Sequence, residues 1–180
     1  MIKRLRVLML AQTAKTGKVY LITGSPQCTL DVSLGGKEKN MDAMIYYGGF
    51  DILFIQFYNQ GAISCTARSR ASKTGGVFNY KQWLAYVRQA GGKSNAARLY
   101  VGLLGGPDGG TAGDYLNVAE VTNLLTTYGK DEQFGGVMLW DAQATANNKD
   151  PAIPAGQKYW HVVKFTMMVS SSPFALALTC

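Results

Sequence analysis

Two apolar runs of this sequence end in large polar and aromatic side chains. The first run ends in Gln56, Tyr58 and Asn59. The second ends in Trp140 and Asp141. Short, continuous apolar runs are typical of strands buried in a parallel sheet, and α/β folds bind ligands at the carboxyl ends of such strands. The two runs therefore predict a ligand site built from amide, phenol and indole groups, although core packing is the alternative for the aromatic rings.

The acidic residues do not form the cluster that acid/base catalysis needs. The chain has eight Asp and three Glu, and none of them stand at the spacing of a paired catalytic site. The glycine-rich stretch 105–113 lacks a phosphate-binding pattern, and Pro107 removes a backbone donor from it. We therefore expect no catalytic residue, no metal and no cofactor in this chain, and we interpret residues 105–113 as a substrate-side loop.

Charge is unevenly distributed along the chain. Residues 1–100 carry fourteen Lys and Arg against four acids, whereas residues 101–180 carry four against seven, for a net charge of +7. The basic residues are scattered and accompany no helix-turn-helix, zinc-finger or RNA-binding pattern, so we expect no nucleic-acid partner. The apolar stretch from Val7 to Ala11 is shorter than a signal peptide requires, and no segment is apolar enough to predict a membrane span.

Strand patterns alternate with helix patterns along most of the chain. Strands are predicted near residues 19–24, 50–57, 98–104 and 134–140. Leu5, Leu8 and Met9 predict the end of an amphipathic helix that is closed by Lys15-Thr16-Gly17. Further helices are predicted at residues 34–47, 80–89 and 118–128, and residues 59–78 are expected to form a loop. The alternation predicts an α/β fold whose parallel strands lie side by side in chain order, with helices on the outer face. Residues 142–180 show no reliable element.

Three cysteines are too few for a disulfide scaffold, and none has metal-binding or redox spacing. Cys28 and Cys65 each follow a predicted strand, so they either meet above the sheet or remain unpaired. The third cysteine, Cys180, has no predicted partner.

Four motifs in this order resemble glycoside hydrolase family 18, most closely its class III chitinases of fungi and plants. They are Ser-Pro-Gln-Cys at 25–28, Gln-Phe-Tyr-Asn at 56–59, Leu-Tyr-Val-Gly-Leu at 99–103 and Gly-Gly-Val-Met-Leu-Trp at 135–140. The resemblance implies that residues 1–141 are strands five to eight of a (β/α)8 barrel, which is a C-terminal half barrel. Residues 142–180 form a tail that does not match.

The same resemblance implies roles for individual residues. Tyr58 would hydrogen-bond the acetamide oxygen of the sugar, Gln56 would lie beside it, and Trp140 would stack under the sugar ring, with Asn59 as a further binding residue. Cys28 and Cys65 would form a disulfide that links two loops. The implied ligand is chitin or an N-acetylglucosamine oligosaccharide, and the implied location is extracellular.

The family's catalytic signature, Asp-x-x-Asp-x-Asp-x-Glu, belongs to strand four and does not occur in these 180 residues. In the substrate-assisted mechanism of this family, that Glu protonates the leaving oxygen while the acetamide attacks the sugar. We expect a chain that resembles an endochitinase but does not hydrolyse chitin alone. The alternatives are a non-catalytic, lectin-like binder of chitin oligosaccharides and an unrelated small α/β domain. Four strands of eight would leave two open edges, which predicts self-association or coverage by the tail.

Overall fold

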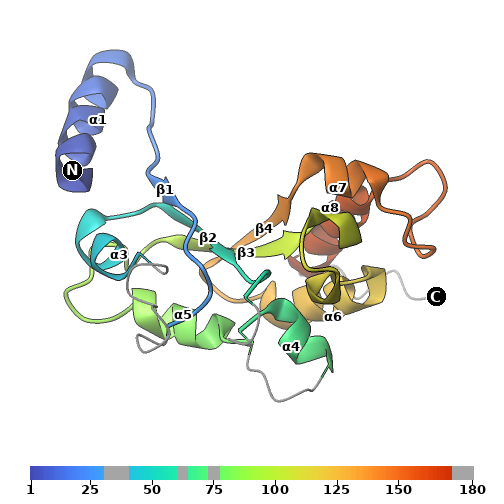
Figure 1. Cartoon of the computed structure of the whole chain (residues 1–180). Coiled ribbons are helices and arrows are strands. Elements are labelled where there is room, and N and C mark those ends of the chain that lie inside the picture. Colours follow the sequence, from blue (N-terminus) through green and yellow to red (C-terminus); the bar gives the residue numbers. More distant parts are fainter. Residues whose placement is uncertain (31–40, 61–64, 73–77, 172–180) are drawn as a thin grey trace.

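The protein is described from a computed structural model, which describes residues 1–30, 41–60, 65–72 and 78–171. Helices and strands alternate along most of the chain (Figure 1). The elements are α1 (Ile2–Thr16), β1 (Thr23–Gly24), α3 (Asp42–Gly48), β2 (Ile52–Gln56), α4 (Ala67–Ser72), α5 (Tyr80–Val87), β3 (Arg98–Leu104), η3 (Pro107–Gly109), η4 (Ala112–Asp114), α6 (Val118–Tyr128), β4 (Phe134–Trp140), α7 (Ala142–Asn147) and α8 (Tyr159–Ser171).

The four strands form one parallel sheet in the order β1-β2-β3-β4. The predicted α/β fold, with parallel strands adjacent in chain order, is therefore confirmed. Three strands lie close to their predicted positions. The first is shorter than predicted, because only Thr23 and Gly24 pair as a ladder with β2.

The chain before β1 is held by a side chain in place of a longer ladder. The carboxylate of Asp51 accepts the backbone N–H of Ile22 at 2.6 Å, and the Ile22 carbonyl accepts the N–H of Asp51 at 2.9 Å. The same carboxylate pairs with the Arg6 guanidinium of α1 at 2.7 Å. One acidic side chain therefore joins α1, the start of the sheet and β2.

One face of the sheet is buried under helices and the other is half-buried. Side chains alternate between the two faces along each strand. On the helix side, Leu53, Ile55, Leu99 and Val101 are fully buried and pack with residues of α5 and α6. On the opposite face the side chains remain partly accessible: Phe54, Gln56, Tyr100, Met138 and Trp140.

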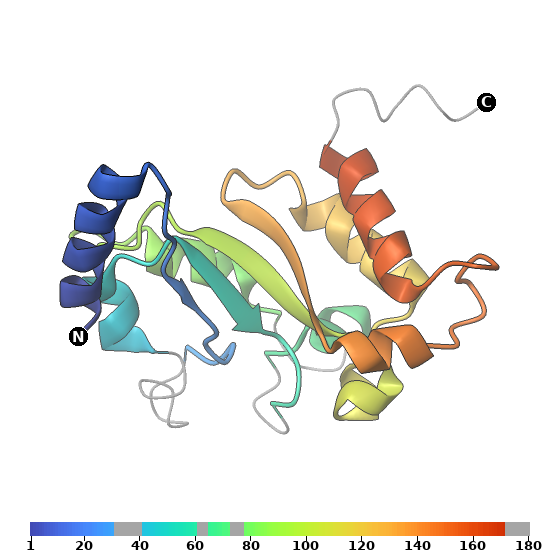
Figure 2. The same ribbon diagram turned by 90° about the horizontal axis from the view of Figure 1, so that it is seen from above.

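Helix α1 lies at the β1 end of the sheet and α8 at the β4 end, while α7 follows the carboxyl end of β4 (Figure 2). The helix predicted at 80–89 is α5, and the helix predicted at 118–128 is α6. The predicted first helix is α1, and it ends at Gly17, whose φ of 70° is a left-handed conformation that glycine adopts without strain.

Two predictions between the strands were wrong in part. The helix expected at 34–47 is α3, which begins only at Asp42, and residues 31–40 lie outside the described residues. The stretch 59–78 was expected to be a loop, yet it contains α4. Helix α4 follows Cys65, and its first residue, Ala67, donates its N–H to the carbonyl of Phe57 at 2.9 Å, so tertiary contacts hold this short helix.

The expectation that residues 142–180 lack regular structure was also wrong for their described part. Helices α7 and α8 both lie there. Tyr159 and Val163 of α8 belong to the same buried core as α6. Helix α7 lies against the loop after β3, at the carboxyl end of the sheet. The sequence signal was weak because α8 buries only a narrow stripe of its surface.

None of the helices in the described ranges is long and apolar enough to cross a membrane.

A disulfide joins the segment after β1 to the start of α4. Cys28 and Cys65 are bonded, with their Cα atoms 5.9 Å apart, inside the bridging range expected from sequence. Both residues are buried. The carbonyl of Cys28 also accepts hydrogen bonds from the Trp83 indole at 2.9 Å and the Asn79 amide at 2.8 Å. The bridge therefore ties the carboxyl ends of β1 and β2 to α5.

We predict that the double variant Cys28→Ala/Cys65→Ala is less stable by about 2–4 kcal/mol, because the bridge closes a loop between positions 37 residues apart and restricts the unfolded chain. Urea unfolding followed by circular dichroism measures the difference. Cys180→Ala, which leaves the bridge intact, serves as the control. Equal unfolding midpoints for the double variant and the unsubstituted protein would contradict the prediction.

Candidate functional site

The strand register brings two of the predicted site residues to one edge of the sheet. Gln56 of β2 is opposite Gly102 of β3, and Gly102 is opposite Met138 of β4. Two residues further along each strand, Leu104 of β3 is opposite Trp140 of β4. Because all strands are parallel, Gln56 and Trp140 both lie at the carboxyl end, on the half-buried face.

Gly102 lets the side chains on this face lie close to the sheet. A Cβ atom at this position would stand 2.6 Å from the carbonyl oxygen of Ile55 and 2.9 Å from the Met138 Cε. Real side-chain carbons do not approach atoms so closely. The glycine is therefore required here, and the Met138 side chain fills the space that another residue would occupy.

Gln56 is half-buried and is oriented by the segment after β1. Its side-chain amide nitrogen donates to the Ser25 carbonyl at 2.9 Å and lies 3.2 Å from the Ser25 hydroxyl. These contacts use the amide donor, so the Gln56 carbonyl oxygen is the group of this side chain suited to accept a hydrogen bond from a ligand.

Tyr58 is buried, with 4% of its surface exposed. Burial raises the pKa of its phenol to about 12, from an ordinary value of 10.0. The phenol is therefore protonated at neutral pH and keeps its O–H donor. Tyr58 is two positions beyond Gln56. The residue between them, Phe57, extends the pairing with β3, because its N–H donates to the Gly102 carbonyl at 3.1 Å.

Asn59 has a structural role in the carboxyl-end loops. Its φ of 58° is left-handed, a conformation that asparagine tolerates better than most residues. Its side-chain oxygen accepts the N–H of Thr111 at 2.7 Å, and its own N–H donates to the Asp114 carboxylate at 2.7 Å. The side chain therefore holds the loop after β3, and its carbonyl oxygen is already occupied.

Trp140 is the more accessible of the two predicted aromatic residues, with 51% of its surface exposed. The peptide bond between Trp140 and Asp141 is cis. Asp141 then begins α7, where its carboxylate accepts the N–H of Ala144 at 2.9 Å. The indole thus lies at the end of β4 as an open apolar plane, while the next carboxylate is engaged in capping a helix.

Two carboxylates near this edge accept backbone N–H groups. Asp114 accepts the N–H of Asn59, and Asp141 accepts the N–H of Ala144. Within the described ranges no group of three or more His, Cys, Asp or Glu is arranged to hold a metal ion. The amide of Gln56 and the exposed indole of Trp140 together suit a polar ligand that has an apolar face.

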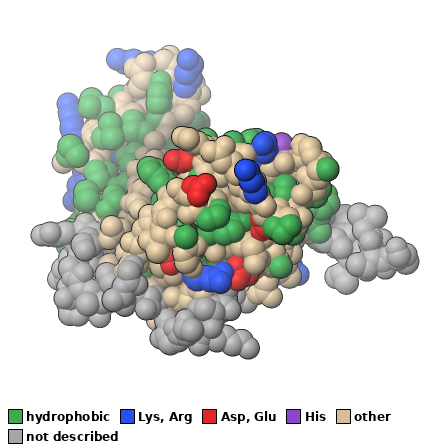
Figure 3. All heavy atoms as spheres, turned by 45° about the vertical axis from the view of Figure 1, so that its right-hand side comes forward, with side chains coloured by type: hydrophobic (Ala, Val, Ile, Leu, Met, Phe, Trp, Pro, Cys, Tyr) green, Lys and Arg blue, Asp and Glu red, His purple; other side chains and the backbone are tan. Residues whose placement is uncertain are grey.

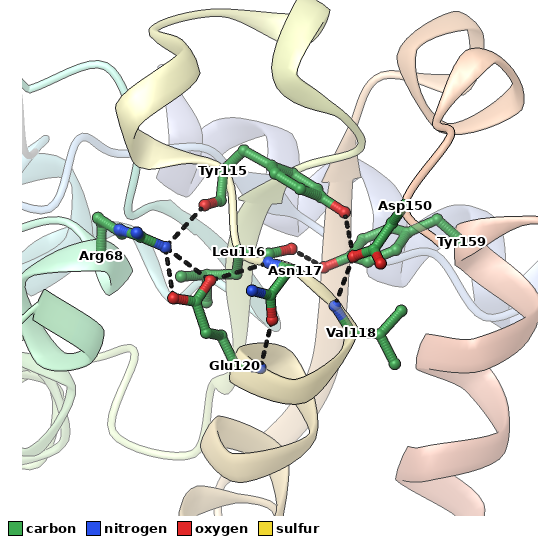
Figure 4. A network of polar contacts seen from close by, with 8 residues as sticks. All are labelled: Arg68, Tyr115, Leu116, Asn117, Val118, Glu120, Asp150 and Tyr159. Carbon is green, nitrogen blue, oxygen red and sulfur yellow. Dashed lines mark hydrogen bonds and ion pairs between the residues drawn. The ribbon is translucent and has the colours of Figure 1, made fainter. Parts of the chain in front are cut away.

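A polar network that was not anticipated from sequence joins α4, the start of α6 and the chain before α8 (Figure 4). Arg68 of α4 contacts both carboxylate oxygens of Glu120, at 2.5 and 2.6 Å. Glu120 and Asn117 form a reciprocal capping box at the start of α6. The spacing Asn-x-x-Glu was a usable signal for the cap, but the partner Arg68 is 52 positions away and could not be inferred.

The same network anchors the chain after β4. Asp150 accepts the N–H of Val118 at 2.9 Å and the hydroxyl of Tyr115 at 3.1 Å, and Tyr159 donates to the carbonyl of Leu116 at 2.7 Å. Burial, and to a lesser extent the nearby Asp150 charge, raise the pKa of the Tyr115 phenol above its ordinary value, so this donor also stays protonated. The segment before α8 is thereby fixed to the start of α6.

Comparison with known proteins reveals similarity to fungal endochitinases. The chain is 32% identical over 157 residues to Endochitinase 2 of Coccidioides posadasii, an alignment covering 86% of this chain and 17% of that protein. It is 32% identical over 137 residues to Endochitinase A1 of Aspergillus fumigatus, covering 75% and 15%. The chain therefore spans less than a fifth of the length of these relatives. No protein-family model matches it.

Two solved structures share the fold. The xylanase and alpha-amylase inhibitor protein XAIP-II of Scadoxus multiflorus superposes with a TM-score of 0.53 at 21% identity, covering 91% of this chain and 49% of that one. The chitinase ICChI of Ipomoea carnea superposes with a TM-score of 0.51 at 19% identity, covering 73% and 43%. The architecture thus corresponds to about half of each of these larger chains.

We predict that Asn59→Ala lowers the free energy of unfolding more than Asn59→Gly does. Both substitutions remove the acceptor for the Thr111 N–H, which costs about 1 kcal/mol. Alanine also disfavours the left-handed backbone, which adds about 1 kcal/mol, whereas glycine accepts it. Urea unfolding compares the two variants, and hydrogen exchange at the Thr111 amide should accelerate in both. Identical stabilities would show that the backbone conformation at residue 59 is not left-handed.

Proposed function

We propose that this chain forms the C-terminal half of a chitinase-type (β/α)8 barrel of glycoside hydrolase family 18, with residues 1–141 supplying strands five to eight. The main support is the strand register that sets Gln56 and Trp140 on one face at the carboxyl edge of the sheet. The sequence similarity to endochitinases and the correspondence to about half of a chitinase chain support the same assignment.

The proposed ligand is a chitin oligosaccharide or another N-acetylglucosamine chain. Trp140 offers an exposed indole plane, which suits the apolar face of a sugar ring. The Gln56 carbonyl oxygen would accept a hydrogen bond from a sugar hydroxyl or amide. Tyr58, protonated at neutral pH, would donate to the acetamide oxygen, and Asn59 would act indirectly, by holding the loop at the site.

The chain alone is proposed to be inactive in hydrolysis. The leaving oxygen of a glycoside needs a proton in the transition state, and general acid catalysis typically contributes about 10²–10⁴-fold. Asp114 and Asp141 are carboxylates beside the proposed site, and each is engaged as the acceptor of a backbone N–H. The signature Asp-x-x-Asp-x-Asp-x-Glu, whose Glu would supply that proton, does not occur in these 180 residues.

The second candidate function is a non-catalytic, lectin-like binder of the same oligosaccharides. The exposure of Trp140 favours it, because an open aromatic plane can bind a sugar without further chemistry. Either function fits an extracellular protein, since the Cys28–Cys65 disulfide is of the kind that persists in oxidising compartments. Oligosaccharide binding by the chain alone would favour this second candidate.

We predict that Trp140→Ala weakens binding of chitin oligosaccharides by roughly tenfold, because covering on the order of 60 Å² of apolar ring contributes about 1.5 kcal/mol. Isothermal titration calorimetry with N-acetylglucosamine oligomers measures the effect. Trp160→Ala is the matched control, since Trp160 is also accessible but lies on α8. A loss of affinity that is equal in both variants would exclude Trp140 as the stacking residue.

We also predict that the purified 180-residue chain releases no reducing ends from chitin oligosaccharides. The measurement is a reducing-end assay on protein expressed in a host without chitinase. Turnover that persists after repurification and is lost in Asp114→Asn or Asp141→Asn would reverse the assignment, because it would identify a catalytic acid within this chain. Glu132→Gln, just before the amino end of β4, controls for general damage.

A further inference from the structure

We propose that the amino end of the sheet carries a second binding site, which takes a linear polysaccharide bearing carboxylate groups. Five basic residues line this site, and we call it the basic surface: Lys3, Arg6, Arg88, Lys93 and Arg98. Arg98 is the first residue of β3, so the basic surface lies at the opposite end of the strands from the proposed sugar site. The inference adds a ligand to the proposed function and does not depend on it.

The first part of the basic surface is a cavity of about 430 Å³ at the end of α5 and the starts of β3 and β4. Arg88 and Arg98 line it, and the buried Gln133 forms part of its wall. The Gln133 amide donates to the carbonyls of Asn95 and Ala97 at 3.0 and 2.9 Å, and its oxygen accepts a hydrogen bond from the Arg88 Nε. A buried amide therefore fixes the Arg88 guanidinium at the cavity.

Both guanidiniums of this cavity keep donors for a ligand. Arg98 donates through Nη1 to the Glu132 carbonyl at 2.5 Å, and its other nitrogen atoms have no hydrogen-bond partner among the described residues. Arg88 pairs with the Glu132 carboxylate at 3.2 Å, but the Glu132 side chain is 88% exposed. Because such an exposed pair contributes little, a ligand carboxylate can replace it. The planar fork of a guanidinium binds carboxylates through two parallel hydrogen bonds.

A second cavity, of about 650 Å³, continues the basic surface toward α1, since Ala96 lines both cavities. Lys3 and Arg6 of α1 line it together with Lys93, from the turn before β3, and Tyr47. The Tyr47 ring is 56% exposed, and the Lys3 ammonium lies 5.5 Å from its centroid. Cationic groups beside an accessible aromatic ring suit a sugar that carries a negative charge.

The distribution of charge favours a long anionic ligand over a single anion. Its cations are divided between two adjoining cavities, so they match anions spaced along a polymer. Acidic side chains lie at the other end of the sheet, where Asp108, Asp114 and Asp141 follow β3 and β4. Lys and Arg side chains lie along α1, which contains no acidic residue (Figure 3). An anionic polymer is therefore attracted to the amino end and repelled from the carboxyl end.

A polymer of sugar acids fits the basic surface better than a nucleic acid does. Channels for nucleic acids stack successive bases on several aromatic side chains. Of the described residues that line the two cavities, Tyr47 is the one exposed aromatic ring, since Phe50 is buried. The anions that the arginines here already bind are the carboxylates of Asp51 and Glu132. Binding at the amino end would hold the protein on an acidic matrix and leave the carboxyl edge accessible.

The test titrates a fluorescently labelled hexamer of galacturonic acid with the 180-residue chain and follows anisotropy. We expect binding that weakens as salt is added, because salt screens exposed charges. Arg88→Gln/Arg98→Gln should weaken it roughly tenfold, since each exposed charge pair contributes up to about fivefold. Lys149→Gln/Lys164→Gln removes the same charge from exposed positions beyond α7 and on α8, and it should change the affinity by less than about twofold. Circular dichroism verifies folding, and the exposed Lys93→Gln gives an independent loss of about twofold to threefold.

Four outcomes would overturn the inference. The first two are absence of binding to the galacturonic acid hexamer and an equal loss of affinity in the arginine and lysine pairs. The third is displacement of the hexamer by an N-acetylglucosamine oligomer, which would place it at the carboxyl edge. The fourth is tighter binding of a single-stranded oligonucleotide of equal charge that Arg88→Gln/Arg98→Gln abolishes, which would assign the basic surface to nucleic acid. If the hexamer binds as expected and the N-acetylglucosamine oligomer does not bind, only the proposed function is refuted.

Discussion

The parallel register of β2, β3 and β4 is the constraint on which the rest of this structure depends. Parallel strands end at the same edge, so residues separated by more than eighty positions, such as Gln56 and Trp140, reach one side of the molecule. The same register forces Gly102 between Gln56 and Met138, because any larger residue would strike the neighbouring strand. Once the register is set, the face, the edge and the spacing of the candidate site follow.

The two faces of the sheet have different roles. The helix-covered face contains fully buried aliphatic side chains such as Leu53 and Val101, and it accounts for most of the core. The opposite face carries the aromatic ring of Tyr100 against Phe54, with centroids 5.1 Å apart, and these side chains are only half-buried. An aromatic face with this accessibility suits ligand binding.

Polar side chains hold the loops around the site in place. Asn59 links the end of β2 to the loop after β3, and Asp150 links the segment before α8 to the start of α6. The Arg68–Glu120 pair is partly exposed, and its geometry positions α4 more than it stabilises the fold, since exposed ion pairs contribute little. Among the described residues, these contacts join the segments that follow β2, β3 and β4 to one another.

Local pattern alone determined the strand and helix order, because apolar runs and helical periodicity reflect burial that each segment must achieve. It also placed Gln56 and Trp140 at strand ends. It left the pairing of Cys28 and Cys65 open; the family resemblance implied their disulfide, and the structure contains it. Only the tertiary structure revealed α4 and α8, which are held by distant contacts, and the structural use of Asn59. Its partners Thr111 and Asp114 lie more than fifty positions away, and no local pattern encodes which loop a side chain will meet.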